Sequence, residues 1–129
     1  MNLLKKIFGK KSPKEIIQEK SENQESVNYF SKQVDRNLKG KEYEEKGEIE
    51  LAIKEYEENL KEKFEGSHPY NRLAIIYRKN GDYDNEIRVL NLAIEIYTKL
   101  SESSPREDVD PKLDKFKKRL EKAVELKKR

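Results

Sequence analysis

The fold of this chain is decided by residues 67–97, SHPYNRLAIIYRKNGDYDNEIRVLNLAIEIY. Apolar side chains recur on both sides of Asn80-Gly81 with the spacing of one helical face. Gly81 is expected to end the first of two helices, because glycine readily adopts the left-handed conformation found there. Ser67 and Pro69 predict the start of that first helix. The apolar positions are Tyr70, Leu73, Ala74 and Tyr77, then Tyr83, Ile87, Leu90, Ala93, Ile94 and Tyr97.

The same pattern occurs once more, earlier in the chain. Gly47 precedes Gly81 by 34 residues (81 − 47 = 34), and the residues around the two glycines correspond. A repeat of this length indicates stacked helical hairpins, because one hairpin cannot bury its apolar side alone. A small residue before each glycine would let the two helices of a hairpin approach closely. The matched pairs are Gly40 and Ala74, Tyr43 and Tyr77, Ile53 and Ile87, Tyr56 and Leu90, and Leu60 and Ile94.

The flanking segments predict further helices around the repeat. Ser12-Pro13 and the capping-box spacing at Ser21-Glu-Asn-Gln24 each predict a helix start. After Ser21, an apolar stripe is expected to dock as an end cap: Val27, Phe30, Val34 and Leu38. We therefore expect an all-α chain with a flexible basic arm (1–12) and a single helical domain (13–129). That domain comprises an N-terminal helical segment (13–32), repeat 1 (33–66), repeat 2 (67–100), a loop (101–110) and a C-terminal capping helix (111–129).

Charge is plentiful and unevenly placed. Charged residues make up 43 % of the chain and hydrophobic residues 33 %, against ~25 % charged in typical domains. This composition fits either disorder or thin helices with one apolar stripe each, and the helical periodicity favours the helices. The net charge of +3 divides into basic ends, 1–14 and 111–129, around an acidic middle, 41–66.

Catalytic and metal chemistry have little support. The chain has no cysteine and only one histidine, His68, so thiolate sites and His/Cys clusters are excluded. Adjacent carboxylates such as Glu44-Glu45 point to different helix faces and are interpreted as solvated surface. We expect no catalytic residues, no metal and no cofactor, and a protein that is not an enzyme.

The second unit resembles a tetratricopeptide repeat, and the first unit is similar at fewer positions; together they span about residues 33–98. The second unit matches at Tyr70, Leu73, Ala74, Tyr77, Gly81, Asp82, Tyr83, Ile87, Leu90, Ala93 and Ile94. The first matches at Gly40, Tyr43, Gly47, Ala52, Ile53, Tyr56 and Leu60. Arg36 and Lys39 replace a large apolar residue of the pattern, and Asn59 and Glu86 replace its usual Ala. The resemblance implies antiparallel hairpins in a short α-solenoid with flanking capping helices.

The resemblance also implies a function, which is to hold a peptide or helix of another protein in a groove lined by the first helix of each unit. The implied lining residues are Asn37, Lys41, His68, Asn71, Arg72, Ile75, Arg78 and Lys79. Some family members clamp a peptide's terminal carboxylate with Lys, Asn and Arg; here those residue types are present in another order. Arg72 and Arg78 are expected to be free for an anionic ligand beside Ile75, because packing does not require them.

Two alternatives stay open. Leu3, Leu4, Ile7 and Phe8 fall on one helical face among lysines, which is typical of a membrane-surface segment. The basic C-terminal helix could contact nucleic-acid phosphates nonspecifically, although it lacks exposed aromatic residues for base stacking, and we regard nucleic acid as an improbable partner. No apolar run has the ~18 residues of a membrane span. The expected location is cytoplasmic, with contact at a membrane surface as the alternative.

Overall fold

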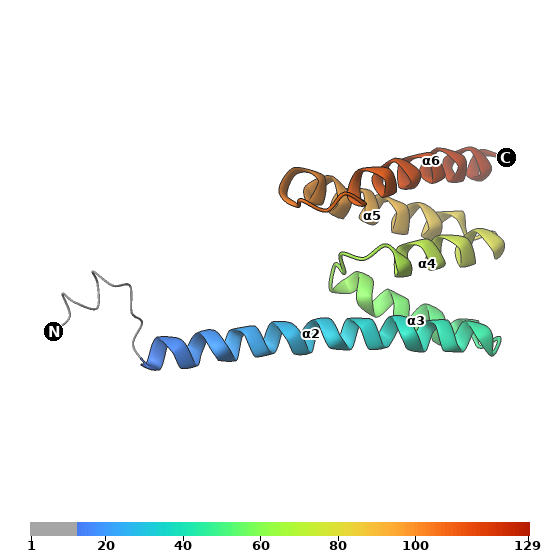
Figure 1. Ribbon diagram of the computed structural model, residues 1–129. Helices are drawn as coiled ribbons and strands as arrows, with labels where there is room; N and C mark the ends of the chain where they lie inside the picture. Colours follow the sequence, from blue (N-terminus) through green and yellow to red (C-terminus); the bar gives the residue numbers. More distant parts are fainter. Residues whose placement is uncertain (1–12) are drawn as a thin grey trace. The chain divides into compact units, whose positions relative to one another are not determined.

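A computed structural model describes the backbone of residues 13–129 and the side chains of residues 26–129. The described chain is all-α, as the sequence predicted. The chain divides into two compact units, unit 1 ending at Asp35 and unit 2 comprising Arg36–Arg129. This boundary falls within the first helix, and within the segment 13–129 that the sequence predicts as one domain. The predicted basic arm, residues 1–12, lies outside the described residues. The helices (Figure 1) are α2 (Pro13–Glu45), α3 (Ile49–Lys61), α4 (His68–Lys79), α5 (Tyr83–Ser103) and α6 (Val109–Lys128).

The two predicted hairpin turns are present and have the same geometry. Gly47 and Gly81 have φ angles of +77° and +73°. The residue after each glycine donates its N–H to a carbonyl five residues earlier: Glu48 to Tyr43, and Asp82 to Tyr77, both at 2.8 Å. This hydrogen bond and the left-handed glycine together form the motif that commonly ends a helix. The 34-residue period therefore corresponds to a repeated turn.

α2 differs from the prediction because it runs without interruption from Pro13 to Glu45. The expected helix boundary at Ser21 is wrong. Residues 14–39 contain no glycine or proline, and a capping signal alone does not break a helix whose hydrogen bonds continue through it. The apolar stripe expected to dock is also largely exposed, with Val27 62 % and Leu38 60 % accessible. No described helix precedes α2 to cover that stripe.

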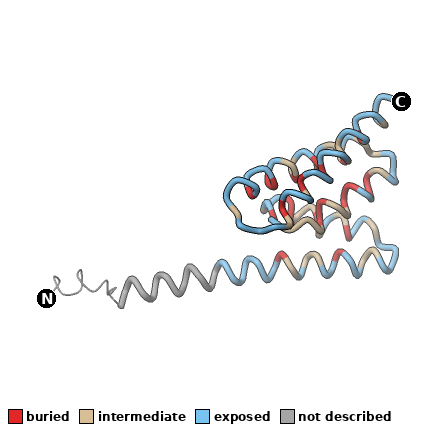
Figure 2. Tube along the Cα trace, turned by 45° about the horizontal axis from the view of Figure 1, so that its top comes forward, coloured by how far each residue is buried: buried red, intermediate tan, exposed pale blue. Residues whose placement is uncertain are grey.

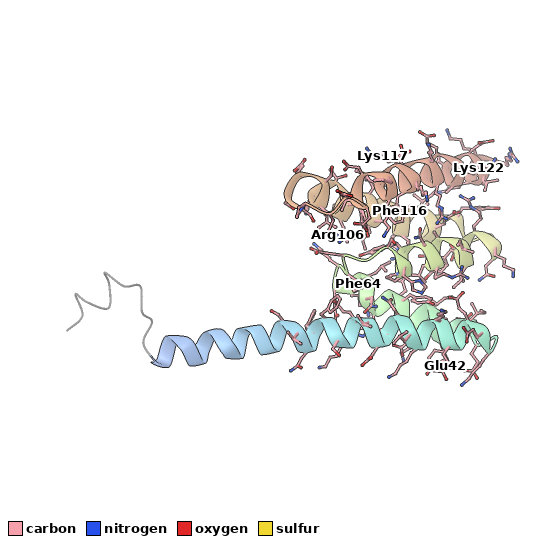
Figure 3. All side chains as sticks on the ribbon, viewed as in Figure 1. Glu42, Phe64, Arg106, Phe116, Lys117 and Lys122 are labelled. Carbon is pink, nitrogen blue, oxygen red and sulfur yellow. The ribbon has the colours of Figure 1, made fainter. Side chains whose placement is uncertain are left out.

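The core of unit 2, Arg36–Arg129, lies between α3, α4, α5 and α6 (Figure 2). Phe116 of α6 meets Tyr97 of α5 and Tyr70 of α4 edge to face, with ring centroids 5.3 and 6.4 Å apart. Figure 3 shows Phe116 on the inner side of α6, whereas Lys117 lies on its outer side. The predicted C-terminal capping helix is thus docked through its apolar face.

The loop predicted at residues 101–110 is shorter in the structure. α5 continues to Ser103 and α6 begins at Val109, two residues before the expected Pro111. Val109 is buried, at 1 % accessible, so the burial of its side chain favours an earlier start of the last helix. Asp108 accepts hydrogen bonds from Arg106 at 2.9 Å and Lys112 at 2.8 Å, which organise the connection.

Candidate functional site

The eight residues predicted to line a groove lie on two helices of unit 2. Asn37 and Lys41 belong to α2, and the other six belong to α4. The structure does not gather them into one site. They are distributed over a polar layer between α2 and α3, a cluster around Glu44, and a pocket beside Glu86, while Lys41 is exposed.

The polar layer between α2 and α3 accounts for two departures from the repeat pattern. Arg36 donates to Glu62 at 2.5 Å and to the buried Asn59 at 3.2 Å. Asn59 in turn donates to Asn37 at 2.9 Å. A buried polar group is tolerated when it is hydrogen-bonded, so Asn59 requires the polar residues opposite it. Asn37 is therefore part of the hairpin's own packing.

The second cluster surrounds Glu44 at the end of α2. Arg72 of α4 engages both carboxylate oxygens of Glu44, with its closest contact at 2.6 Å, and Tyr56 of α3 donates its hydroxyl at 2.6 Å. The side chain of Glu44 is only 14 % exposed. The interpretation of Glu44 as solvated surface is therefore wrong. A fork of two hydrogen bonds from Arg to a carboxylate is among the stronger polar contacts in proteins, so this cluster joins three helices.

The ionisation of the cluster follows from its burial and its partners. Burial alone would raise the pKa of Glu44, but the hydrogen bonds from Arg72 and Tyr56 outweigh it and hold that pKa below the ordinary value. Burial and the neighbouring carboxylate raise the pKa of Tyr56. Burial lowers the pKa of His68, whose ring packs edge to face on Tyr56 with centroids 5.5 Å apart. At neutral pH the cluster therefore holds an ionised Glu44 and a neutral His68.

The third cluster surrounds Glu86 of α5, whose side chain is only 2 % exposed. Arg78 of α4 donates its Nε to Glu86 Oε2 at 2.6 Å and an Nη2 to the backbone oxygen of Arg119 at 3.2 Å. Arg119 of α6 donates to Asn71 Oδ1 at 2.8 Å. Desolvation by burial raises the pKa of Glu86 against the opposing effect of Arg78. The other carboxylate oxygen, Oε1, has no hydrogen-bond partner.

A pocket of about 330 Å³ opens beside this cluster, between α4, α5 and α6. Its apolar part includes Ile75, which is 41 % exposed. Three of its lining side chains are cationic and one is acidic, so its charge is +2 when all four are ionised (3 − 1 = 2). The lining residues are Ala74, Ile75, Arg78, Lys79, Glu86 and Arg119.

Two expectations about the groove are corrected by these contacts. Arg72 and Arg78 are not free of packing roles, because each pairs with a carboxylate of a neighbouring helix. Asn71 accepts a hydrogen bond from α6, and Arg72 is directed to Glu44, so the two do not frame Ile75 with Arg78 as expected. Within the described chain, Ile75, Arg78 and Lys79 are the predicted residues that line the pocket.

The sequence interpretation missed Glu44, Glu86 and Arg119 as members of these clusters. The sequence could have indicated a partner for Glu86. This residue replaces a small, buried residue of the repeat pattern, and a buried acid needs a cation beside it. Arg119 carried no such signal, because it is one of nine basic residues in 111–129. Only the packing of α6 distinguishes it from the others.

Most charges on α6 have partners within unit 2. Ion pairs join Lys112 to Asp108 at 2.8 Å, Lys118 to Asp114 at 3.1 Å and Lys127 to Asp84 at 2.6 Å. Such pairs lower the positive field that the basic composition suggested. Lys117 and Lys122 are both exposed, and Figure 3 shows Lys117 on the outer side of this helix.

The described part of the chain contains neither a membrane-spanning helix nor a cluster of metal-ligating side chains. Across residues 13–129, none of the helices combines the length and apolar composition needed to cross a bilayer. Within residues 26–129, whose side chains the structure describes, no three His, Asp or Glu side chains are grouped so that they could hold a metal ion. Leu3, Leu4, Ile7 and Phe8, the residues of the membrane-surface alternative, lie outside the described part of the chain.

The fold and the clusters together define a class: an all-α protein of stacked helical hairpins with a cationic pocket beside its last helix. The chain belongs to the family described as an uncharacterized protein conserved in bacteria (DUF2225), whose sequence model matches residues 4–116. No curated protein and no solved structure matches the chain.

Proposed function

We propose that this chain is a non-catalytic protein-interaction module that holds a peptide or helix of a partner protein on the surface formed by α4 and α6. The observation that carries the proposal is the pocket between these helices, which has an exposed apolar residue, Ile75, among cationic side chains. Binding pockets typically combine apolar lining with a few placed polar groups, and this one combines Ala74 and Ile75 with the side chains of Arg78, Lys79, Glu86 and Arg119.

The proposal includes the assignment of the two hairpins as tetratricopeptide-like repeats. Its support is the pair of turns at Gly47 and Gly81, which share φ angles, hydrogen bonds and a 34-residue separation. In such repeats the first helix of each unit lines the binding surface, and α4 is the first helix of the second unit. The single histidine, His68, packs on Tyr56 and outside the pocket, which favours binding over catalysis.

Site-directed photo-crosslinking of the intact chain tests this function. The photoreactive residue p-benzoylphenylalanine would replace Ile75, and in a second variant Asn91, which is exposed on α5. After irradiation in a bacterial extract, we expect protein adducts from position 75 that position 91 does not give. Equal labelling from both positions, or no adduct from position 75, would refute the function.

A further inference from the structure

The charges around the α4–α6 pocket leave hydrogen-bond donors in excess. Of the three cations, Arg78 is paired with Glu86, whereas Lys79 has no ion pair within the described chain. Arg119 donates one Nη1 hydrogen bond to Asn71, and a guanidinium carries five N–H groups. Since Glu86 is the only acid in the lining, Lys79 and Arg119 have unused capacity for an anion.

One residue that lines the pocket, Glu86, also has a carboxylate oxygen that lacks a donor. Glu86 Oε1 is buried and has no hydrogen-bond partner, and a buried acceptor without a donor destabilises the folded chain until a donor reaches it. A fully deprotonated oxyanion such as sulfate cannot supply that donor, and inorganic phosphate, whose O–H group could, has no aliphatic part to cover Ile75. A peptide supplies both kinds of group, a side-chain carboxylate for the cations and a backbone N–H for Oε1.

The size and the apolar part of the pocket restrict the ligand further. A volume of about 330 Å³ lies at the small end of the ~300–1,000 Å³ typical of ligand pockets, which suits a short segment rather than a whole helix. Ile75 and Ala74 line it beside the cations, and Ile75 is 41 % exposed. An aliphatic side chain next to the carboxylate would cover Ile75.

We propose that this pocket binds a short segment of a partner protein in which an Asp or Glu lies next to an aliphatic residue. The carboxylate of the segment sits between Lys79 and Arg119, and its aliphatic side chain packs on Ile75. One of its backbone N–H groups donates to Glu86 Oε1. This inference rests on the proposed function, because it specifies the partner's chemistry at the same surface.

Selection from a random peptide library, displayed on phage and panned on the intact chain, tests the inference. We expect the enriched peptides to share an acid beside an aliphatic residue. The best peptide, labelled with fluorescein, would be titrated by anisotropy. We expect two single changes to weaken binding about tenfold each, which equals about 1.4 kcal/mol. One replaces the acidic residue of the peptide by its amide, and the other is Lys79→Ala in the protein. Together the two changes should weaken binding by clearly less than the product of the two separate effects, because both of them remove the contact between Lys79 and the carboxylate.

Two controls separate the pocket from general charge attraction. Lys117→Ala removes an exposed lysine from the outer side of α6 and should leave the affinity unchanged. Millimolar inorganic phosphate should not displace the peptide more than chloride of equal ionic strength does. N-methylation of each backbone amide in turn should identify one position whose donor is required, as expected for the hydrogen bond to Glu86.

The outcomes distinguish this inference from the proposed function. The inference would be overturned by any one of three results. The enriched peptides could lack the acidic–aliphatic motif, Lys79→Ala and Lys117→Ala could weaken binding equally, or phosphate could displace the peptide. If crosslinking at Ile75 still captures a protein under those conditions, the function stands and the ligand chemistry is wrong. If crosslinking at Ile75 fails, the function fails as well.

Discussion

At the scale of single residues, Glu86 shows how a departure from a repeat pattern is accommodated. A carboxylate replaces a small residue at a buried position, and Arg78 from the neighbouring helix meets it at 2.6 Å. Removing one partner of a buried pair commonly costs about 3–5 kcal/mol, since the other charge is left uncompensated. The arrangement thus makes Arg78 structural and leaves Lys79 as the more available cation of α4.

Glu86→Gln is predicted to change the pH dependence of stability. Because burial raises the pKa of Glu86 in the folded state above its ordinary 4.5, the folded protein binds this proton more tightly than the unfolded chain does. The resulting stabilisation is complete below the unfolded pKa and is lost as pH rises through the folded pKa. The variant, which cannot titrate, should therefore gain stability relative to the wild type as pH rises from about 4.5 towards neutrality.

Urea unfolding at a series of pH values measures this difference. Glu95→Gln is the matched control, because Glu95 lies on the same helix with its side chain 54 % exposed. The control should show no comparable trend with pH. The prediction would be contradicted if the free energy of unfolding of the wild type rose relative to that of the Glu86→Gln variant as pH increases.

At the scale of elements, the approach of α2 to α3 depends on the absence of a side chain at Gly40. Gly40 is buried, and a Cβ atom built there would overlap the ring of Tyr56. That ring is fully buried, and its hydroxyl is held by Glu44. It therefore cannot move aside as the end of a flexible side chain would.

Gly40→Ala should destabilise the protein by about 1–2 kcal/mol. Alanine improves helix propensity by ~1 kcal/mol over glycine, but overpacking against a fixed ring typically costs 1–3 kcal/mol, and the ring's hydrogen bond to Glu44 would be disturbed as well. Chemical denaturation measures the difference. Lys39→Ala, at the exposed neighbouring position, should stay within ~0.5 kcal/mol of the wild type. An increase in stability for Gly40→Ala would show that the two helices separate easily.

At the scale of the whole molecule, the buried hydrophobic residues found among residues 26–129 extend from Ala52 to Ala123. They all belong to the unit Arg36–Arg129. Cooperative unfolding requires a shared core, so this unit should hold most of the stability of the chain.

Deletion of residues 1–35 should leave the urea midpoint nearly unchanged and lower the m-value only slightly, because m follows the surface exposed on unfolding. Deletion of residues 109–129 is the contrasting variant. It removes Phe116, the ring that meets Tyr70 and Tyr97, and should abolish the cooperative transition. A large loss of stability in the first variant would show that residues 1–35 contribute to the core.

The sequence by itself determined the helices and the turns between them. Helical periodicity predicted α3, α4, α5 and α6 to within a few residues, and the 34-residue period predicted the two turns at Gly47 and Gly81. These features are local, because a helix and its end depend on residues three to five positions apart. The helix boundary expected at Ser21 is absent for a related local reason. A capping residue can start a helix, but it does not end a helix that already runs into it, and no glycine or proline stands there to do so.

Only the tertiary structure decided which charges meet. The chain has 29 basic and 26 acidic residues, and local spacing identifies only partners on the same helix. Arg72 pairs with Glu44 across 28 residues, and Arg119 bonds Asn71 across 48. Such contacts depend on how far one helix slides and turns against the next, which is set by the packing of Phe116, Tyr97 and their neighbours. The sequence thus determined the candidate surface on α4, whereas the packing of α6 determined which of its side chains face a pocket.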